Sequence, residues 1–404
     1  MLTVFHPEAI HFVRDIPIGI IPFHFENEAF PTLVIKANKE AILASKLEQK
    51  FKIYIAPINL DNHKTIGLIS AFFDDADEPL IICTPLFEEP NTDDFIKLLL
   101  SKNVSVYFLD EKNIEYLGYE TIIECNANTQ STLKGANFLP FTLYYTRSAF
   151  NQMRMWFSLR SQKEDRSAIT LSFRKSLVPE DLFIQDLIPQ NHFYHGSGEI
   201  SFTELERKEP GYYQERDIVR LLHRFFLPEQ IYLNPLRVTD KEEIADIVVA
   251  TDKNILLIQA KDSPNTELII RNTMKRKKAA AVKKLNAAIK QTKGALRYIG
   301  SSSHIKMIID EKEREIKIGD RQLRTLVLVK ELFDDGFSIY SPIILSLVKS
   351  TSIPCIALDY SELNIYTSKL ADEFSFFEAY DRISNYGIQY GIFPRLLILP
   401  NHEE

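Results

Sequence analysis

Apolar and polar positions along residues 1–150 follow two alternating patterns. Apolar residues have helical spacing in "NKEAILASKLEQ" and "TDDFIKLLLSK", and they form short continuous runs in "TLVIKA", "FKIYIAPI", "TIGLISAFF", "LIICTPLF" and "VSVYFLD". The first pattern predicts amphipathic helices, and the second predicts buried strands. Strands that alternate with helices indicate a mixed α/β domain.

The pattern changes after residue 150. Residues 151–210 are less regular, and glycine and proline cluster near 196–212. Beyond this cluster the pattern predicts a helix over 213–227, a strand over 231–236, a hairpin over 244–261, a long helix over about 275–299 and a strand over 323–330. We therefore predict two domains, a mixed α/β domain over residues 1–198 and a second α/β domain over residues 199–404.

The predicted hairpin brings three polar side chains together. Its sequence, "EEIADIVVATDKNILLIQAK", has room for a two-residue turn at either 252–253 or 253–254. The first turn places Asp246 opposite Gln259, and the second places it opposite Lys261. Because side chains alternate between the faces of a strand, Asp246, Gln259 and Lys261 project from one face with either turn.

These three side chains suit phosphodiester chemistry. Carboxylate and amide oxygens are the ligands that Mg²⁺ prefers, and a lysine can orient a water molecule or stabilise developing charge. The alternative is a surface salt bridge between Asp246 and Lys261 beside an ordinary glutamine.

Two flanking helices add candidates to this group. Glu215 lies three and four positions before Ile218 and Val219, so it belongs to the apolar stripe of its helix, where an acid must be paired or bind a metal. The alternative is that Glu215 only begins the helix in solvent. Gln291 lies at the edge of the apolar face of the long helix, from where its amide could point into a site.

Composition and charge narrow the function classes. The chain has 404 residues, 45% hydrophobic and 25% charged, with a net charge of −7. No apolar run approaches the ~20 residues that span a bilayer, no secretory signal is evident, and three scattered cysteines suit a reducing compartment. We therefore expect a cytoplasmic protein with no membrane association.

The long helix departs from the acidic average. Residues 271–297 contain ten Lys or Arg and no acid. A surface with charge of one sign is a candidate for phosphate contacts, and the alternative is a solvated helix face. The candidate nucleic-acid contacts are Lys275, Arg276, Lys277, Lys278, Lys283 and Lys284.

The two helices and the hairpin together resemble the PD-(D/E)XK nuclease superfamily, and the resemblance covers about residues 205–345. The Gln259-Ala260-Lys261 segment is similar to the Mrr-like and nuclease-related branches, in which glutamine replaces the acid before x-Lys. The resemblance implies a restriction-endonuclease-like domain with an αβββαβ core and a mixed sheet. It also implies a Mg²⁺- or Mn²⁺-dependent endonuclease that hydrolyses DNA or, less often, RNA.

The resemblance also assigns roles. Glu215 and Asp246 would hold the metal with Gln259 as a neutral ligand, Lys261 would act on the water or phosphate, and Gln291 would help to align the site. Ala245 stands where the family has proline, and Gln259 removes one negative charge. A non-catalytic nucleic-acid or protein binding module on a degenerate nuclease fold is therefore the alternative.

The first 198 residues carry no comparable motif. We expect them to serve sensing, substrate selection or dimerisation, with a homo-oligomer as one form. By analogy alone, a nuclease domain with a large partner domain fits bacterial antiviral defence or restriction.

Overall fold

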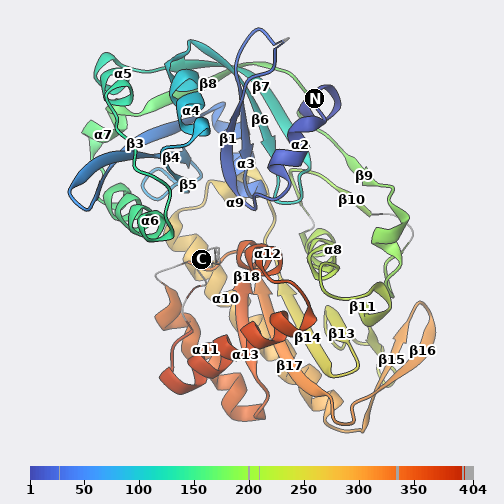
Figure 1. Ribbon diagram of the computed structural model, residues 1–404. Helices are drawn as coiled ribbons and strands as arrows, with labels where there is room; N and C mark the ends of the chain where they lie inside the picture. The colour runs from blue at the N-terminus through green and yellow to red at the C-terminus, as the bar shows by residue number, and fades with distance from the viewer. Residues whose placement is uncertain (27, 199–200, 209, 334–335, 394, 396–404) are drawn as a thin grey trace.

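A computed structural model of the chain describes residues 1–26, 28–198, 201–208, 210–333, 336–393 and 395. The N-terminal and C-terminal halves of the chain are stacked on each other, and each contains its own sheet (Figure 1). Both halves are mixed α/β, which confirms the predicted class. Among the described residues, no helix combines the length and apolar character needed to cross a membrane.

The N-terminal half is built on a curled mixed sheet with the strand order β1-β2-β6-β7-β8-β3-β4-β5. β2 and β6 pair in parallel, and the other neighbours are antiparallel. The edge strands β1 and β5 contact each other, so the sheet curls around its core. The strands are β1 (Gly19–Phe23), β2 (Thr32–Lys36), β3 (Lys50–Leu60), β4 (His63–Phe72), β5 (Leu80–Pro85), β6 (Asn103–Leu109), β7 (Glu115–Glu124) and β8 (Ile169–Ser176).

Helices cover this sheet in three places. α3 and α4 pack into the main core, α6 packs on β3 and β4 through Met153 and Phe157, and α1 and α2 pack beside β2. α6 and β7 had no counterpart in the predicted pattern. The helices are α1 (Leu2–Phe5), α2 (Glu8–Val13), α3 (Lys39–Glu48), α4 (Pro90–Leu100), α5 (Ala127–Lys134), α6 (Leu143–Ser158) and α7 (Gln162–Ser167).

The C-terminal half is built on a sheet with the order β11-β13-β14-β17-β18. β11, β13 and β14 are antiparallel, whereas β14, β17 and β18 are parallel. Small antiparallel sheets lie beside it, β12-β15-β16 and the ribbon of β9 and β10. β9 (Ile184–Asp186) comes before residue 199 in the sequence and pairs with β10. The other strands are β10 (Ser201–Thr203), β11 (Ile231–Leu233), β12 (Leu236–Arg237), β13 (Ile247–Ala250), β14 (Asn254–Lys261), β15 (His304–Ile309), β16 (Lys312–Lys317), β17 (Gln322–Val329) and β18 (Cys355–Asp359).

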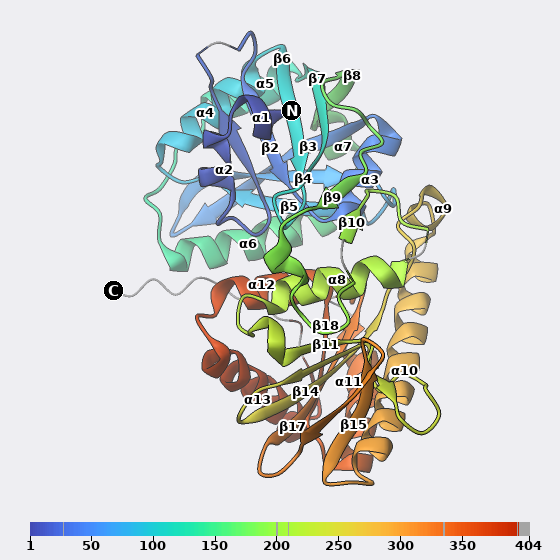
Figure 2. The same ribbon diagram turned by 90° about the vertical axis from the view of Figure 1, so that its right-hand side faces the viewer.

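Two helices of this half are important for the site. α10 packs along β14 and β17, and its bounds match the predicted basic helix. α8 lies, with α12, on the side that faces the N-terminal half (Figure 2). The helices are α8 (Pro210–Leu222), α9 (Glu267–Ile270), α10 (Met274–Ile299), α11 (Phe337–Thr351), α12 (Tyr360–Lys369) and α13 (Glu373–Tyr390).

The two halves share apolar packing. Leu205 and Ile270 follow the predicted boundary in sequence, yet both are buried in the core of the N-terminal half. Glu199, the first residue of the predicted second domain, lies outside the described residues. The boundary at 198 and 199 therefore stays a prediction.

Candidate active site

The β13–β14 hairpin has the register of the first predicted turn. Ile247 pairs with Ile258 and Ala250 pairs with Ile255, so residues 252 and 253 form the turn. The Thr251 amide donates to the Asn254 carbonyl at 2.9 Å and closes it. Asp246 comes directly before the first paired residue, opposite Gln259. The predicted two-residue hairpin is confirmed.

Asp246 is the centre of a buried polar group. Its Oδ2 accepts hydrogen bonds from Gln259 Nε2 and from the Ala260 amide, both at 2.5 Å. Lys261 Nζ lies 4.0 Å from the same oxygen. Asp246 is 3% exposed and Gln259 is 5% exposed. The structure therefore brings together the three hairpin residues that the sequence predicted.

Burial changes the acidity of Asp246. It raises the pKa of this carboxyl to about 6, although Lys261 and the Ala260 amide act in the opposite direction. Within the described residues both hydrogen-bond donors reach Oδ2, and none reaches Oδ1. Oδ1 is consequently the oxygen that remains for a cation or a water molecule.

Glu215 approaches Asp246 from α8. Its Oε2 accepts a hydrogen bond from Asn234 Nδ2 at 2.9 Å. Burial raises the pKa of Glu215 to about 7, the Asn234 hydrogen bond opposes this shift, and the charge of Asp246 adds to it. The side chain is half-buried, whereas the sequence analysis placed Glu215 on the buried apolar stripe of its helix.

Asn234 and Glu243 belong to this group but were not predicted. The Asn234 amide donates to the Asp246 carbonyl at 2.9 Å while its side chain holds Glu215, and its φ of 51° is in the left-handed region that asparagine tolerates. Glu243 is exposed, and its charge raises the pKa of both Asp246 and Glu215. The sequence signals were an asparagine directly after a strand and an acid three positions before Asp246.

The oxygen atoms of this group are of the chemical type that binds a hard divalent cation. Their number, however, is small. Asp246, Glu215 and Gln259 supply carboxylate and amide oxygens, which Mg²⁺ and Mn²⁺ accept. Among the described residues, however, no group of three or more His, Cys, Asp and Glu side chains is placed to hold a metal ion. A cation here would keep water ligands and take further oxygens from a substrate phosphate.

Gln291 is not part of this group, which corrects the prediction. It is exposed on α10. Its neighbour Thr292 is on the buried stripe with Ala288 and Ala295, and a step of one residue turns about 100° around a helix. The amide of Gln291 therefore points to solvent.

The predicted nucleic-acid contacts on α10 separate into two sets. Lys275, Arg276 and Lys283 are exposed. Lys277, by contrast, is 10% exposed and pairs with Asp74 at 2.5 Å, and Lys278 pairs with Glu78 at 3.5 Å. Lys284 donates to the Asp262 carbonyl. An acidic loop from the N-terminal half therefore folds onto this helix and pairs with Lys277 and Lys278, and their role as nucleic-acid contacts stays a prediction.

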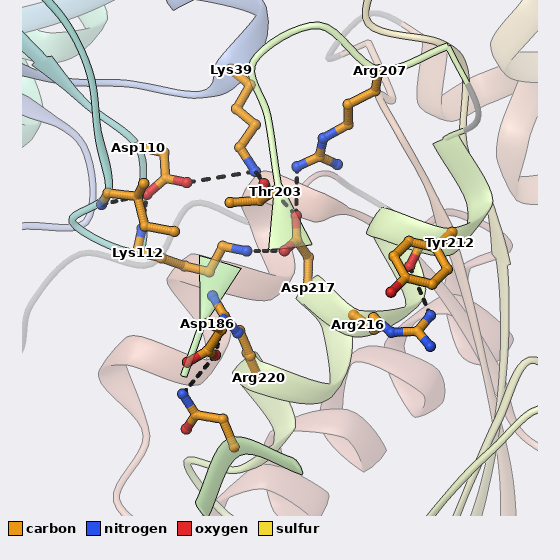
Figure 3. A network of polar contacts seen from close by, with 12 residues as sticks. Lys39, Asp110, Lys112, Asp186, Thr203, Arg207, Tyr212, Arg216, Asp217 and Arg220 are labelled. Carbon is orange, nitrogen blue, oxygen red and sulfur yellow. Dashed lines mark hydrogen bonds and ion pairs between the residues drawn. The ribbon is translucent and has the colours of Figure 1, made fainter. Parts of the chain in front are cut away.

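Asp217 fixes α8 to the N-terminal half (Figure 3). Its Oδ2 lies 3.3 Å from Lys39 Nζ and 2.7 Å from Arg207 Nη2, and its Oδ1 pairs with Lys112. Lys39 also lies 3.6 Å from Asp110 Oδ2. Since Glu215 is on the same helix, this buried ion network connects the helix that bears Glu215 to the N-terminal half.

A cavity of about 270 Å³ lies beside Lys261, between the two halves. Lys284 and Lys330 also line it, as do Asp262 and Glu331. Burial lowers the pKa of Lys284, and the charges of Lys261 and Lys330 contribute to the shift. Three lysines therefore lie near one another at the carboxyl ends of β14 and β17.

Comparison with known proteins gives no match: no family model, curated protein or solved structure matches this chain.

Proposed function

We propose that this chain is a metal-dependent nuclease that hydrolyses phosphodiester bonds, with DNA favoured over RNA. The proposal depends on one observation, the grouping of Asp246, Gln259 and Lys261 at one end of a hairpin with Glu215 nearby. Perturbed acids beside a lysine are typical of catalytic sites. The preference for DNA comes from the family resemblance alone.

Each side chain has a role in the proposed reaction. Asp246 Oδ1, Glu215 and the Gln259 amide oxygen would hold Mg²⁺ or Mn²⁺. When bound, the cation would neutralise negative charge on the phosphate and lower the pKa of a water molecule. Lys261 orients the attacking water or stabilises the charge that develops on the phosphate oxygens. Asn234 keeps Glu215 and the backbone of Asp246 in place.

The order of elements around the site gives further support. α8 precedes the antiparallel strands β11, β13 and β14, and the parallel strand β17 follows α10 after the β15–β16 hairpin. When the strands of the small β12-β15-β16 sheet and the short helix α9 are set aside, this order is compatible with the αβββαβ core that the resemblance implies.

The decisive experiment measures cleavage by purified protein. Plasmid, linear DNA and RNA are each incubated with Mg²⁺, Mn²⁺ or EDTA. We expect Lys261→Ala and Asp246→Asn to reduce cleavage by a hundredfold or more, since Lys261 would act mainly in the transition state and Asp246 would hold the cation. The hairpin offers matched controls, because Lys253→Ala and Asp252→Asn change exposed residues of its turn.

The outcome that rejects the proposal is specific. Cleavage that is equal in Lys261→Ala, Asp246→Asn and the turn controls would place the activity elsewhere. A wild-type protein that cleaves no substrate with either metal would favour the second candidate.

That second candidate is a non-catalytic binding module on the same fold. It is favoured by the contacts that Asp246 Oδ2 already makes with Gln259, the Ala260 amide and Lys261 without a metal ion. It predicts nucleic-acid or protein binding that is unchanged by EDTA. Measuring binding with and without EDTA therefore separates the two candidates.

A further inference from the structure

A second cleft, distinct from the candidate active site, lies between the two halves of the chain. It has a volume of about 720 Å³, which is in the range of small-molecule sites. Six cationic side chains line it, Arg14, Lys36, Lys112, Arg220, Arg224 and Lys369, with Asp15 and Glu111 as the acids of the lining. Both halves contribute to this excess of positive charge.

Part of this charge is neutralised by neighbouring acids. Lys112 pairs with Asp217, and Arg220 pairs with Asp186 (Figure 3). Arg14 lies 3.4 Å from Asp15 at the exposed rim.

Lys36 and Arg224 have a different environment. Lys36 is 1% exposed, and its Nζ donates to the carbonyls of Val13 at 3.2 Å and Arg14 at 3.3 Å. Arg224 donates to the Asn364 carbonyl and amide oxygens, both at 3.1 Å, and to Thr367 Oγ1 at 2.8 Å. Among the described residues, both cations thus bind neutral oxygens only.

Burial of these cations has an electrostatic cost. Burial lowers the pKa of Lys36 to about 8, while the charges of Asp110 and Glu111 oppose this shift and the charge of Arg224 adds to it less strongly. Burial and the charge of Lys39 likewise lower the pKa of Lys112, and the charge of Asp110 opposes that shift. A bound anion would stabilise the charged forms of both lysines.

Unsatisfied polar atoms line the same cleft. Asn364 is 1% exposed, and its Nδ2 has no acceptor among the described residues. The buried Nε2 of His223 and the acceptor atoms Glu111 Oε2 and Asn113 Oδ1 are also without a partner there. Buried polar atoms are normally hydrogen-bonded, so such a group indicates bound water or a polar ligand.

We propose that this cleft binds a small phosphate-bearing molecule of nucleotide size. The cations and the donors of Asn364 and His223 would bind the phosphate oxygens. The acceptors Glu111 and Asn113 would accept hydrogen bonds from hydroxyl or amino groups of a sugar or base, which tripolyphosphate lacks. Because Arg220 lies in the last turn of α8 and His223 and Arg224 follow that helix, the cleft is separate from Glu215 near its amino end.

Isothermal titration of the full-length protein tests this site directly. The probes are ATP, inorganic tripolyphosphate and a single-stranded oligonucleotide. We expect ATP to bind, and we expect Arg224→Gln to weaken it about tenfold or more through loss of a charge-assisted contact. Lys369→Gln and Arg14→Gln change exposed side chains, so they should weaken binding severalfold without affecting the fold.

Matched controls exclude a general effect of charge. Arg382→Gln and Lys349→Gln remove one exposed charge each from helices outside the cleft, and ATP binding should be unchanged. The proposal is overturned if ATP does not bind or if the controls weaken binding equally. It is also overturned if the cleft variants weaken only oligonucleotide binding, because the cleft would then be a nucleic-acid surface. Cleavage assays do not enter this test, so its result is independent of the nuclease proposal.

Discussion

Among single residues, Gln259 determines which oxygen of the Asp246 carboxylate is hydrogen-bonded. Its amide nitrogen donates to Asp246 Oδ2, so the Gln259 amide oxygen and Asp246 Oδ1 are the oxygens that the proposed cation would use. An acid at position 259 would instead face Asp246 at hydrogen-bond distance. Two such carboxylates repel each other unless a proton or a cation lies between them.

Replacing Gln259 by Glu should therefore change metal affinity and stability in opposite directions. We expect Gln259→Glu to bind Mn²⁺ about tenfold or more tightly than wild type, because the site gains a negative charge. Without metal, the variant should lose about 2 kcal/mol of stability from buried repulsion. Calorimetric titration and urea denaturation measure the two effects. Gln291→Glu, an exposed change on α10, is the control that should alter neither.

Metal binding should also depend on pH through the two acids. The pKa of Asp246 is raised to about 6 and that of Glu215 to about 7. Protons therefore compete with the cation below pH 7, and affinity should increase roughly 100-fold from pH 5.5 to pH 8. Titration with Mn²⁺ at both pH values measures it. Glu215→Gln should leave only a few-fold dependence, and an affinity that is equal at both pH values would contradict these roles.

The site residues that were predictable are those whose positions depend on local sequence patterns and not on contacts between distant elements. Asp246, Gln259 and Lys261 were predictable because a two-residue turn and a period of two fix which side chains share a face. Asn234 was not, since its role depends on a left-handed backbone conformation and on contacts with two other elements. Gln291 was misplaced because a position at the edge of a helical stripe is decided by tertiary packing.

Among the elements, α8 connects the candidate site to the rest of the molecule. Glu215 faces the hairpin, while Asp217, two residues later, is buried among Lys39, Lys112 and Arg207. The helix therefore bears carboxylates on two sides, one for the site and one for the interface. Its position depends on charges that are distant in the sequence.

Removing the charge of Asp217 should be costly. We expect Asp217→Asn to destabilise the protein by about 3 kcal/mol or more, because it leaves buried cations without their counter-ion. Urea denaturation followed by circular dichroism measures the change. Asp94→Asn breaks an exposed pair with Lys97 at 3.5 Å and should cost no more than about 1 kcal/mol. Equal effects of the two substitutions would show that the network contributes little.

Elements with a strong pattern were predictable, and elements with a weak one were not. β2 to β6, α3, α4 and α10 follow apolar periods that the sequence shows directly. β16, with the sequence "KEREIK", is mostly exposed and lacks such a period. α6 buries Ala149, Met153 and Phe157 against β3 and β4, but it also exposes Tyr144 and Met155, which obscures its helical stripe.

In the whole molecule, an acidic loop of the N-terminal half covers the start of the basic helix. Asp74 pairs with Lys277, Glu78 pairs with Lys278, and Asp75 Oδ2 accepts the Met274 amide at 3.2 Å. That amide is at the amino end of α10, where helices also bind phosphates. The loop thus occupies positions that the sequence assigned to nucleic acid.

Neutralising this loop should strengthen nucleic-acid binding, if the proposed function holds. We expect Asp75→Asn with Glu78→Gln to raise DNA affinity about three- to tenfold at low salt. The salt dependence should become steeper because more cations reach phosphates. Fluorescence anisotropy over a range of salt concentrations measures both. As the control, Glu89→Gln with Asp93→Asn removes the same amount of charge from exposed positions at α4. This control should raise DNA affinity less than the loop variant does. An equal increase in both variants would indicate a non-specific charge effect.

The ion network around Asp217 also restricts how this chain can change during evolution. Its members come from both halves, Lys39 and Lys112 from one and Arg207 and Asp217 from the other. A mutation at one position leaves a buried charge unmatched until a second mutation compensates for it. These positions should therefore vary together among descendants of a common ancestor. A chimera that joins halves from divergent lineages should fold only where both carry the same set of charges.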